Sequence, residues 1–153
     1  MKKNTLGIIG AMLVAILAVT ACSTIAGVLS PSSTTSITVK SVTLAGGLDA
    51  NYQAVSPKTQ FRSTDTIYVS VDVTGRPTTG TLNGKFYYGD QLISEATLDF
   101  SNVNQGVIVS FGGDTFVAFT LLQSQPNPVN TGYHFDLYAN GTKIGSYPYQ
   151  ITQ

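Results

Sequence analysis

The stretch TIYVSVDV, residues 66–73, decides the fold class because its aliphatic side chains recur at every second position. Strict alternation of this kind is typical of a strand that buries one face in an antiparallel sheet. The two phases are Ile67, Val69, Val71 and Val73 on the expected inner face, and Thr66, Tyr68, Ser70 and Asp72 on the expected outer face. We therefore expect a half-buried β-strand here.

The same period of two continues along the chain. In residues 81–88, Leu82, Phe86 and Tyr88 fall on the inner phase, and Lys85 and Tyr87 on the outer phase. Further strands are predicted at residues 37–44, 91–100, 107–111, 115–122, 133–139 and 143–151. Together with 66–73 and 81–88 they make eight, and no segment after residue 35 has the apolar period of a helix.

Turn residues separate these strands. Asn140-Gly141 predicts a two-residue hairpin, because both central residues of a type I′ turn need positive φ, and Gly89-Asp90 predicts a second. Pro148 lacks an N–H donor and indicates an edge strand. Ile144 and the series Tyr147, Tyr149 and Ile151 differ by one in phase, so a bulge near Gly145 is expected. The directions of Tyr147 and Tyr149 stay open.

Many short strands at even spacing predict an all-β sandwich or barrel for residues 36–153. The order of the pieces resembles an immunoglobulin-like domain of the bacterial surface-protein type. The motifs that carry the resemblance are FRSTDTIYVSV (61–71), GKFYYG (84–89), FVAF (116–119), GYHFDLY (132–138) and NGTK (140–143). The resemblance implies an antiparallel sandwich of about seven or eight strands.

The resemblance also implies roles for three aromatic residues. Phe86 takes the place of the buried tryptophan on the third strand, Phe135 takes that of the second core cysteine, and Tyr133 takes that of a tyrosine corner. The chain lacks Trp and has a single Cys. Aromatic packing therefore has to hold the sandwich together without a disulfide.

The N-terminus has the order of a secretory signal: Lys2 and Lys3 precede an apolar segment. That segment ends in Val19-Thr20-Ala21-Cys22, which resembles the lipobox of bacterial lipoproteins. The resemblance implies a signal helix in residues 1–21, cleavage before Cys22 and lipid on the Cys22 thiol. Residues 22–35, rich in Ser and Thr, then form a flexible linker. The alternative is an uncleaved transmembrane helix over residues 6–29.

Composition excludes several function classes. The 153 residues carry 8 Lys+Arg and 8 Asp+Glu, so the chain lacks the basic surface that nucleic-acid binding needs. One His and one Cys cannot supply the three or four protein ligands of a zinc site. We expect no nucleic-acid partner, no metal and no cofactor.

His134 is the single histidine and the candidate general base at neutral pH. Asp136 follows two residues later on the same strand face, where the two side chains are expected to diverge into solvent. The 8 acidic residues fall singly on turns and outer strand positions, which is typical of solvated surface groups. No G-x-S-x-G motif is present. We expect a protein that is not an enzyme.

The candidate binding face lies on two strands that the immunoglobulin-like order makes neighbours. It comprises Lys85, Tyr87, His134, Asp136 and Tyr138, all on outer phases. Tyrosine offers ring area and a hydroxyl, which suit glycans and protein partners. We expect a lipid-anchored protein on the extracytoplasmic side of the cell envelope that binds or assembles through this domain. A glycan-binding accessory domain that uses its outward tyrosines is the alternative.

Overall fold

The computed structural model describes residues 36–102, 108–122 and 125–153, and the described chain contains strands and no helix. The described segments form ten strands: β1 (Val39–Leu48), β2 (Ala54–Pro57), β3 (Gln60–Arg62), β4 (Ile67–Val73), β5 (Thr81–Tyr88), β6 (Gln91–Asp99), β7 (Ile108–Phe111), β8 (Asp114–Leu121), β9 (Asn130–Ala139) and β10 (Thr142–Thr152). The predicted all-β class is confirmed for this part of the chain.

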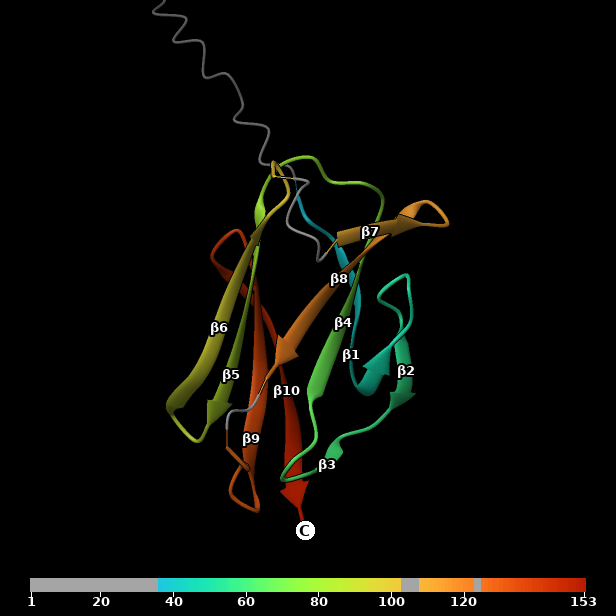
Figure 1. Cartoon of the computed structure of the whole chain (residues 1–153). Helices are drawn as coiled ribbons and strands as arrows, with labels where there is room; N and C mark the ends of the chain where they lie inside the picture. Colours follow the sequence, from blue (N-terminus) through green and yellow to red (C-terminus); the bar gives the residue numbers. More distant parts are fainter. Residues whose placement is uncertain (1–35, 103–107, 123–124) are drawn as a thin grey trace, which may run out of the picture. The chain divides into compact units, whose positions relative to one another are not determined.

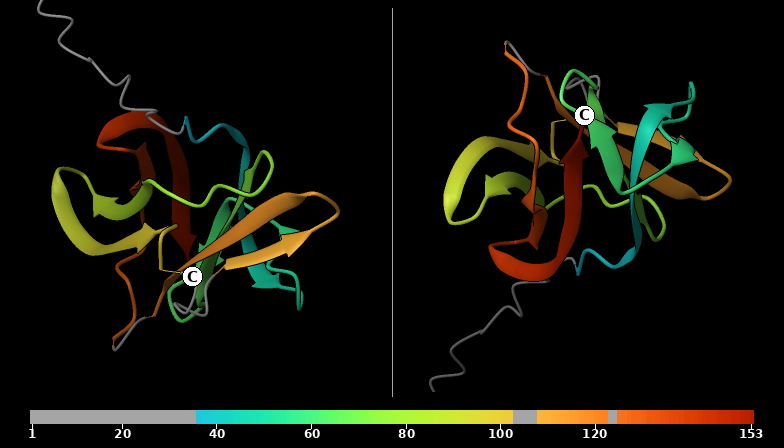
Figure 2. Two further views of the ribbon diagram at one scale, coloured as in Figure 1. Left: turned by 90° about the horizontal axis from the view of Figure 1, so that it is seen from above. Right: turned by 90° about the horizontal axis from the view of Figure 1, so that it is seen from below.

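The strands form two five-stranded sheets that face each other (Figure 1). The first, sheet A, has the order β2-β1-β4-β8-β7, and the second, sheet B, has the order β3-β10-β9-β5-β6. All pairs are antiparallel except β3 with β10, which run parallel. The views from above and below show the two layers side by side (Figure 2). This arrangement is a β-sandwich.

Each of the eight predicted strands is present in the described residues, with ends shifted by a few positions. The expected count of seven or eight is nevertheless wrong, because β2 and β3 were not predicted. Both are short, and each pairs with one neighbour: β2 with β1, and β3 with β10. Neither is long enough to carry a period of two. Residue 107, the predicted start of the seventh strand, lies outside the described residues.

The alternation in residues 66–73 places four side chains in the core as predicted: Ile67, Val69, Val71 and Val73 are each 0% exposed. Ser70, expected on the outer face, is buried instead. Its hydroxyl donates to the Tyr52 carbonyl at 2.7 Å, because the β1–β2 connection passes over this part of β4. Ser70 is thus buried by a loop from elsewhere in the chain, which the alternation of apolar and polar residues within 66–73 cannot predict.

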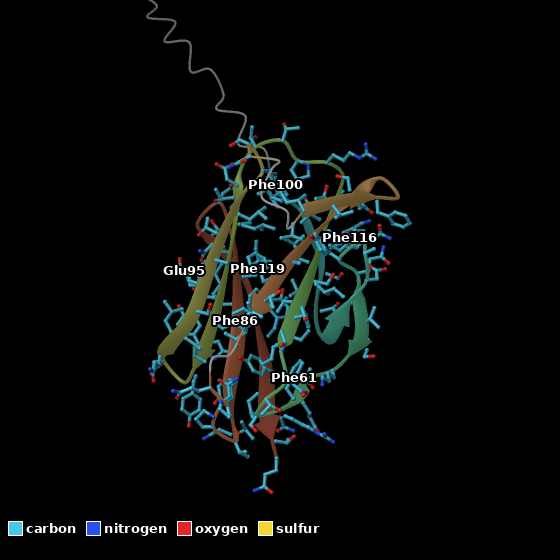
Figure 3. The ribbon with its side chains drawn as sticks, in the orientation of Figure 1. Phe61, Phe86, Glu95, Phe100, Phe116 and Phe119 are labelled. Atoms are coloured by element: carbon cyan, nitrogen blue, oxygen red, sulfur yellow. The ribbon has the colours of Figure 1, made fainter. Side chains whose placement is uncertain are left out.

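Aromatic rings fill the space between the sheets (Figure 3). Phe135 on β9 packs 4.9 Å from Phe86 on β5 and 5.5 Å from Phe119 on β8, so one ring cluster joins sheet B to sheet A. Phe61 on β3 meets Tyr149 on β10 edge to face, with 5.8 Å between the ring centroids. Burying one such ring contributes about 1.5–3 kcal/mol. The expected burial of Phe86 and Phe135 is confirmed.

The hairpin turns follow their sequence signals. Asn140 and Gly141 have φ of 49° and 79°, as a type I′ turn requires, and Gly89 has φ of 55°. The β9–β10 register shifts between Lys143 and Gly145, which confirms the expected bulge. Beyond the bulge Tyr149 is buried and Tyr147 packs partly against the core, which resolves the phase of the last strand.

Within the described residues no helix is both long enough and apolar enough to cross a membrane. The predicted signal helix (1–21) and linker (22–35), with Cys22, lie outside the described residues.

Candidate functional site

The five candidate residues lie together on the outer surface of sheet B. Lys85 and Tyr87 lie on β5, and His134, Asp136 and Tyr138 lie on the neighbouring strand β9. The register pairs Lys85 with Asp136 and Tyr87 with His134. Cross-strand partners on one face of an antiparallel pair have Cβ atoms about 4.5–5.5 Å apart. The sequence-based grouping of these five side chains therefore corresponds to a real neighbourhood.

The rings of Tyr87 and His134 stack against each other. Their centroids are 5.0 Å apart and their planes differ by 11°. Each ring therefore turns one face toward the other ring, so that face is not available to a ligand. Both residues are half-buried.

Lys85 is held by two neighbours on the same face. Its Nζ lies 3.6 Å from the Glu95 carboxylate on β6 and 5.4 Å from the centroid of the Tyr138 ring. An ammonium group over a tyrosine ring is attracted by the negative ring face and contributes about 0.5–1 kcal/mol at exposed sites. The cation thus occupies one face of the Tyr138 ring, as His134 occupies one face of the Tyr87 ring.

Asp136 is buried, with 4% of its surface exposed, so the expectation of a solvated acid is wrong for this residue. Lys85 and Ser146 are its cross-strand partners on β5 and β10, and they flank it on both sides. Its Oδ2 accepts a hydrogen bond from Lys143 Nζ at 2.7 Å. Its Oδ1 is buried, has no hydrogen-bond partner among the described residues and lies 3.8 Å from His134 Nε2. The two side chains therefore converge, contrary to the expectation that they diverge into solvent.

The electrostatics keep Asp136 ionised. Burial raises the pKa of its carboxyl, but hydrogen bonds from Lys143 and Ser146 outweigh burial, so the pKa lies below its ordinary value. The hydrogen bond to Asp136 in turn raises the pKa of Lys143. A carboxylate held ionised in this way is a poor proton donor at neutral pH.

Three residues of this network were missed from the sequence: Glu95, Lys143 and Ser146. The hairpin signal at Asn140-Gly141 could have located one of them, because a two-residue turn there places Lys143 opposite Tyr138. The β5–β6 and β9–β10 registers each contain a shift, however, and a shift moves every later pair by one. Glu95 and Ser146 lie beyond such shifts.

No group of three or more His, Cys, Asp or Glu side chains in residues 36–102, 108–122 and 125–153 is arranged to hold a metal ion. At its surface the network on sheet B offers stacked rings, two ammonium groups and the Glu95 carboxylate, whereas the Asp136 carboxylate is buried. These groups suit hydrogen bonding and ring contacts with a partner.

A groove of about 530 Å³ lies away from this face, between β1 and β10. Residues 58 and 59 connect the two strands beside the groove: Lys58 N–H donates to the Leu44 carbonyl of β1, and Gln150 N–H of β10 donates to the Thr59 carbonyl. Pro148 lines the groove on the part of β10 that pairs with β9 alone, as its predicted edge position requires. Proline at a sheet edge opposes pairing with a further strand.

No protein-family model matches this chain, and no curated protein matches it in sequence.

Proposed function

We propose that this protein is a lipid-anchored protein of the cell envelope that carries one immunoglobulin-like domain, residues 36–153, on the extracytoplasmic side. The domain binds a partner or assembles with it, and catalyses no reaction. The observation that carries the immunoglobulin-like part of this proposal is the strand order of the two sheets.

The strand order supports the immunoglobulin-like assignment. Such domains place strands A, B, E and D in one sheet and G, F and C in the other, with C′ added beside C in the variable type. Sheet A has the run β1-β4-β8-β7 and sheet B the run β10-β9-β5-β6. Chain order assigns these strands to A-B-E-D and G-F-C-C′, with β2 and β3 as additions at the edges.

The environment of Tyr133 gives independent support. Its hydroxyl donates to the Pro128 carbonyl, five residues upstream, at 2.8 Å. A tyrosine corner makes this kind of bond from the start of strand F, two residues before the core cysteine. Tyr133 stands near the start of β9, two residues before the buried Phe135.

The anchor rests on the sequence Val19-Thr20-Ala21-Cys22 after an apolar segment. Cleavage before Cys22 and acylation give two or more acyl chains, and stable membrane anchoring takes more than one chain. Residues 22–35 then connect the lipid to the domain. The alternative anchor is an uncleaved transmembrane helix over residues 6–29.

The surface formed by Lys85, Tyr87, His134, Asp136 and Tyr138 is one candidate contact surface for a protein or glycan partner. Its hydrogen-bonding groups and ring edges lie on the outer side of sheet B, opposite the core.

Labelling of producing cells with radioactive palmitate tests the anchor, with Cys22→Ser as the matched variant. We expect label in the wild-type protein and none in Cys22→Ser, which should also leave the membrane fraction. An unlabelled wild-type protein that stays in the membrane would instead support the uncleaved helix.

A further inference from the structure

A hollow of about 400 Å³ lies on the outer surface of sheet A, where residues of the β1–β2 hairpin face strands β4 and β8. Two tyrosines line it, Tyr52 from the hairpin and Tyr68 from β4. Asp49 of the hairpin and Thr120 of β8 add a carboxylate and a hydroxyl. The volume falls within the roughly 300–1,000 Å³ range of small-molecule sites.

Small residues leave this space open. Ala118, which pairs with Ser70, lies on the outer phase of β8 between the positions of Phe116 and Thr120. Gly46 and Gly47 line the hollow from β1. A Cβ at Gly47 would meet no other atom within 4 Å. A larger side chain at Ala118 or Gly47 would occupy volume that is now free.

The loop that carries Tyr52 is held in place by hydrogen bonds within the protein. Asp49 Oδ1 accepts hydrogen bonds from the N–H groups of Asn51 and Gln53, both at 2.8 Å. The Tyr52 carbonyl accepts the bond from the buried Ser70 hydroxyl, which ties the loop to β4. These bonds hold Tyr52 at φ of 60°, a region that a tyrosine rarely adopts. A strained residue held by its surroundings often marks a binding site.

The lining selects the chemistry of the ligand. Tyrosine rings pack against the apolar C–H faces of a sugar ring, and their hydroxyls, Thr120 and Asp49 can hydrogen-bond to sugar hydroxyls. No Lys or Arg is among the residues that line the hollow, so nothing in the lining neutralises an acidic sugar. We propose that this hollow binds a neutral glycan. The inference deepens the proposed binding function and rests on it.

Titration calorimetry on the full-length protein in a detergent without a sugar head group tests the proposal. The probes are the neutral oligosaccharides cellohexaose, maltohexaose, mannohexaose, xylohexaose and N-acetylchitohexaose, with oligogalacturonate as the acidic control. We expect at least one neutral probe to bind and oligogalacturonate not to bind. Failure of every neutral probe, or preference for the acidic one, overturns the proposal.

Three variants locate the binding. Tyr68→Ala removes one ring, and Gly47→Phe fills the hollow at a position with room for a side chain; each should weaken binding about tenfold or more. Phe111→Ala removes an exposed ring on β7 that does not line the hollow; it is the control and should leave the affinity unchanged. Binding that survives both of the first two changes, or that is lost in Phe111→Ala instead, contradicts the assignment. Thermal melting of each variant checks that it folds. If Tyr68→Ala does not fold, Gly47→Phe alone still decides whether the hollow is the binding site.

This test and the palmitate test fail separately. A lipidated protein that binds none of the neutral probes loses the glycan site and keeps the envelope assignment. A protein that binds a neutral glycan and carries no lipid keeps the site and loses the anchor.

Discussion

The rings of Tyr133 and Tyr149 stack inside the sandwich, with centroids 5.4 Å apart and planes 24° from parallel, yet only one of the two hydroxyls has a hydrogen-bond partner among the described residues. The Tyr133 hydroxyl donates to the Pro128 carbonyl at 2.8 Å. The Tyr149 hydroxyl is buried and has no hydrogen-bond partner among the described residues. Burial raises the pKa of both tyrosines. Charge repulsion from Tyr88 raises the pKa of Tyr133 further, and charge repulsion from Tyr133 does the same for Tyr149. Removing the Tyr133 hydroxyl should therefore lower the stability of the domain, whereas removing the Tyr149 hydroxyl should not.

We expect Tyr133→Phe to lower the free energy of unfolding by about 0.5–1.5 kcal/mol, because the Pro128 carbonyl loses its donor. Tyr149→Phe should leave it unchanged or raise it by about 1 kcal/mol, because an unsatisfied buried hydroxyl is removed. Urea unfolding of the two variants beside the wild type measures both effects. Equal losses in the two variants would mean that the Tyr149 hydroxyl has a partner.

The ring cluster around Phe135 is expected to carry much of the stability. Phe86→Ala or Phe135→Ala should cost about 3–5 kcal/mol, because each empties a ring-sized volume between the sheets, and should unfold the domain near 37 °C. Phe111→Ala is the control, since Phe111 is 51% exposed and should cost less than about 0.5 kcal/mol. A melting curve of Phe135→Ala that matches the wild type would refute the core assignment.

Gly84 lies in the middle of β5 under two rings. A Cβ at this position would lie 2.7 Å from Phe119 Cδ1 and 2.8 Å from Phe135 Cε2. Gly84→Ala should therefore destabilise the domain by about 1–3 kcal/mol through overpacking. Gly47→Ala makes the same chemical change where nothing lies within 4 Å, so thermal melting should show no loss there. A neutral Gly84→Ala would show that the two rings can move apart freely.

The Asp136–Lys143 pair predicts a pH dependence. The folded-state pKa of Asp136 is lowered, so its contribution is present above the unfolded pKa of about 3.9 and is lost as pH falls through the folded pKa. Asp136→Asn should cost about 1–3 kcal/mol at pH 7. The difference from wild type should shrink as pH falls below about 4, because the unfolded wild-type chain then takes up a proton at this carboxyl, and it should be smallest below the folded pKa, where the folded carboxyl is protonated too.

Urea unfolding from pH 7 to pH 2 measures this difference. Asp90→Asn, at an exposed turn, serves as the control and should change stability by less than about 0.5 kcal/mol. A cost of Asp136→Asn that stays constant over the whole pH range would show that the ionised carboxylate contributes nothing.

Local patterns predicted the strands of the sandwich well. Alternation in residues 66–73 identified four core residues, and Asn140-Gly141 identified a hairpin whose φ values agree with a type I′ turn. Both signals act between residues close in the chain. By contrast β3 is held by parallel pairing with residues 150–152, ninety positions away, and three residues leave no periodic signal.

The candidate sites were harder to predict, because they depend on what lies across the strands. The outer phase correctly grouped Tyr87 with His134, but Asp136 on the same phase is buried between Lys85 and Ser146, and Ser146 lies beyond a shift in the β9–β10 register. The hollow on sheet A depends on a loop that holds Tyr52 at positive φ. Asp49 followed by Asn51 was visible in the sequence, yet nothing local indicated that this loop would reach Ser70.

Intact-mass spectrometry of the protein extracted from membranes tests the central claim most directly, because one spectrum reports both cleavage and modification. The account predicts a chain that has lost residues 1–21 and carries a diacylglycerol with a further acyl group on Cys22. An unmodified chain that still begins at Met1 in the membrane fraction would contradict it.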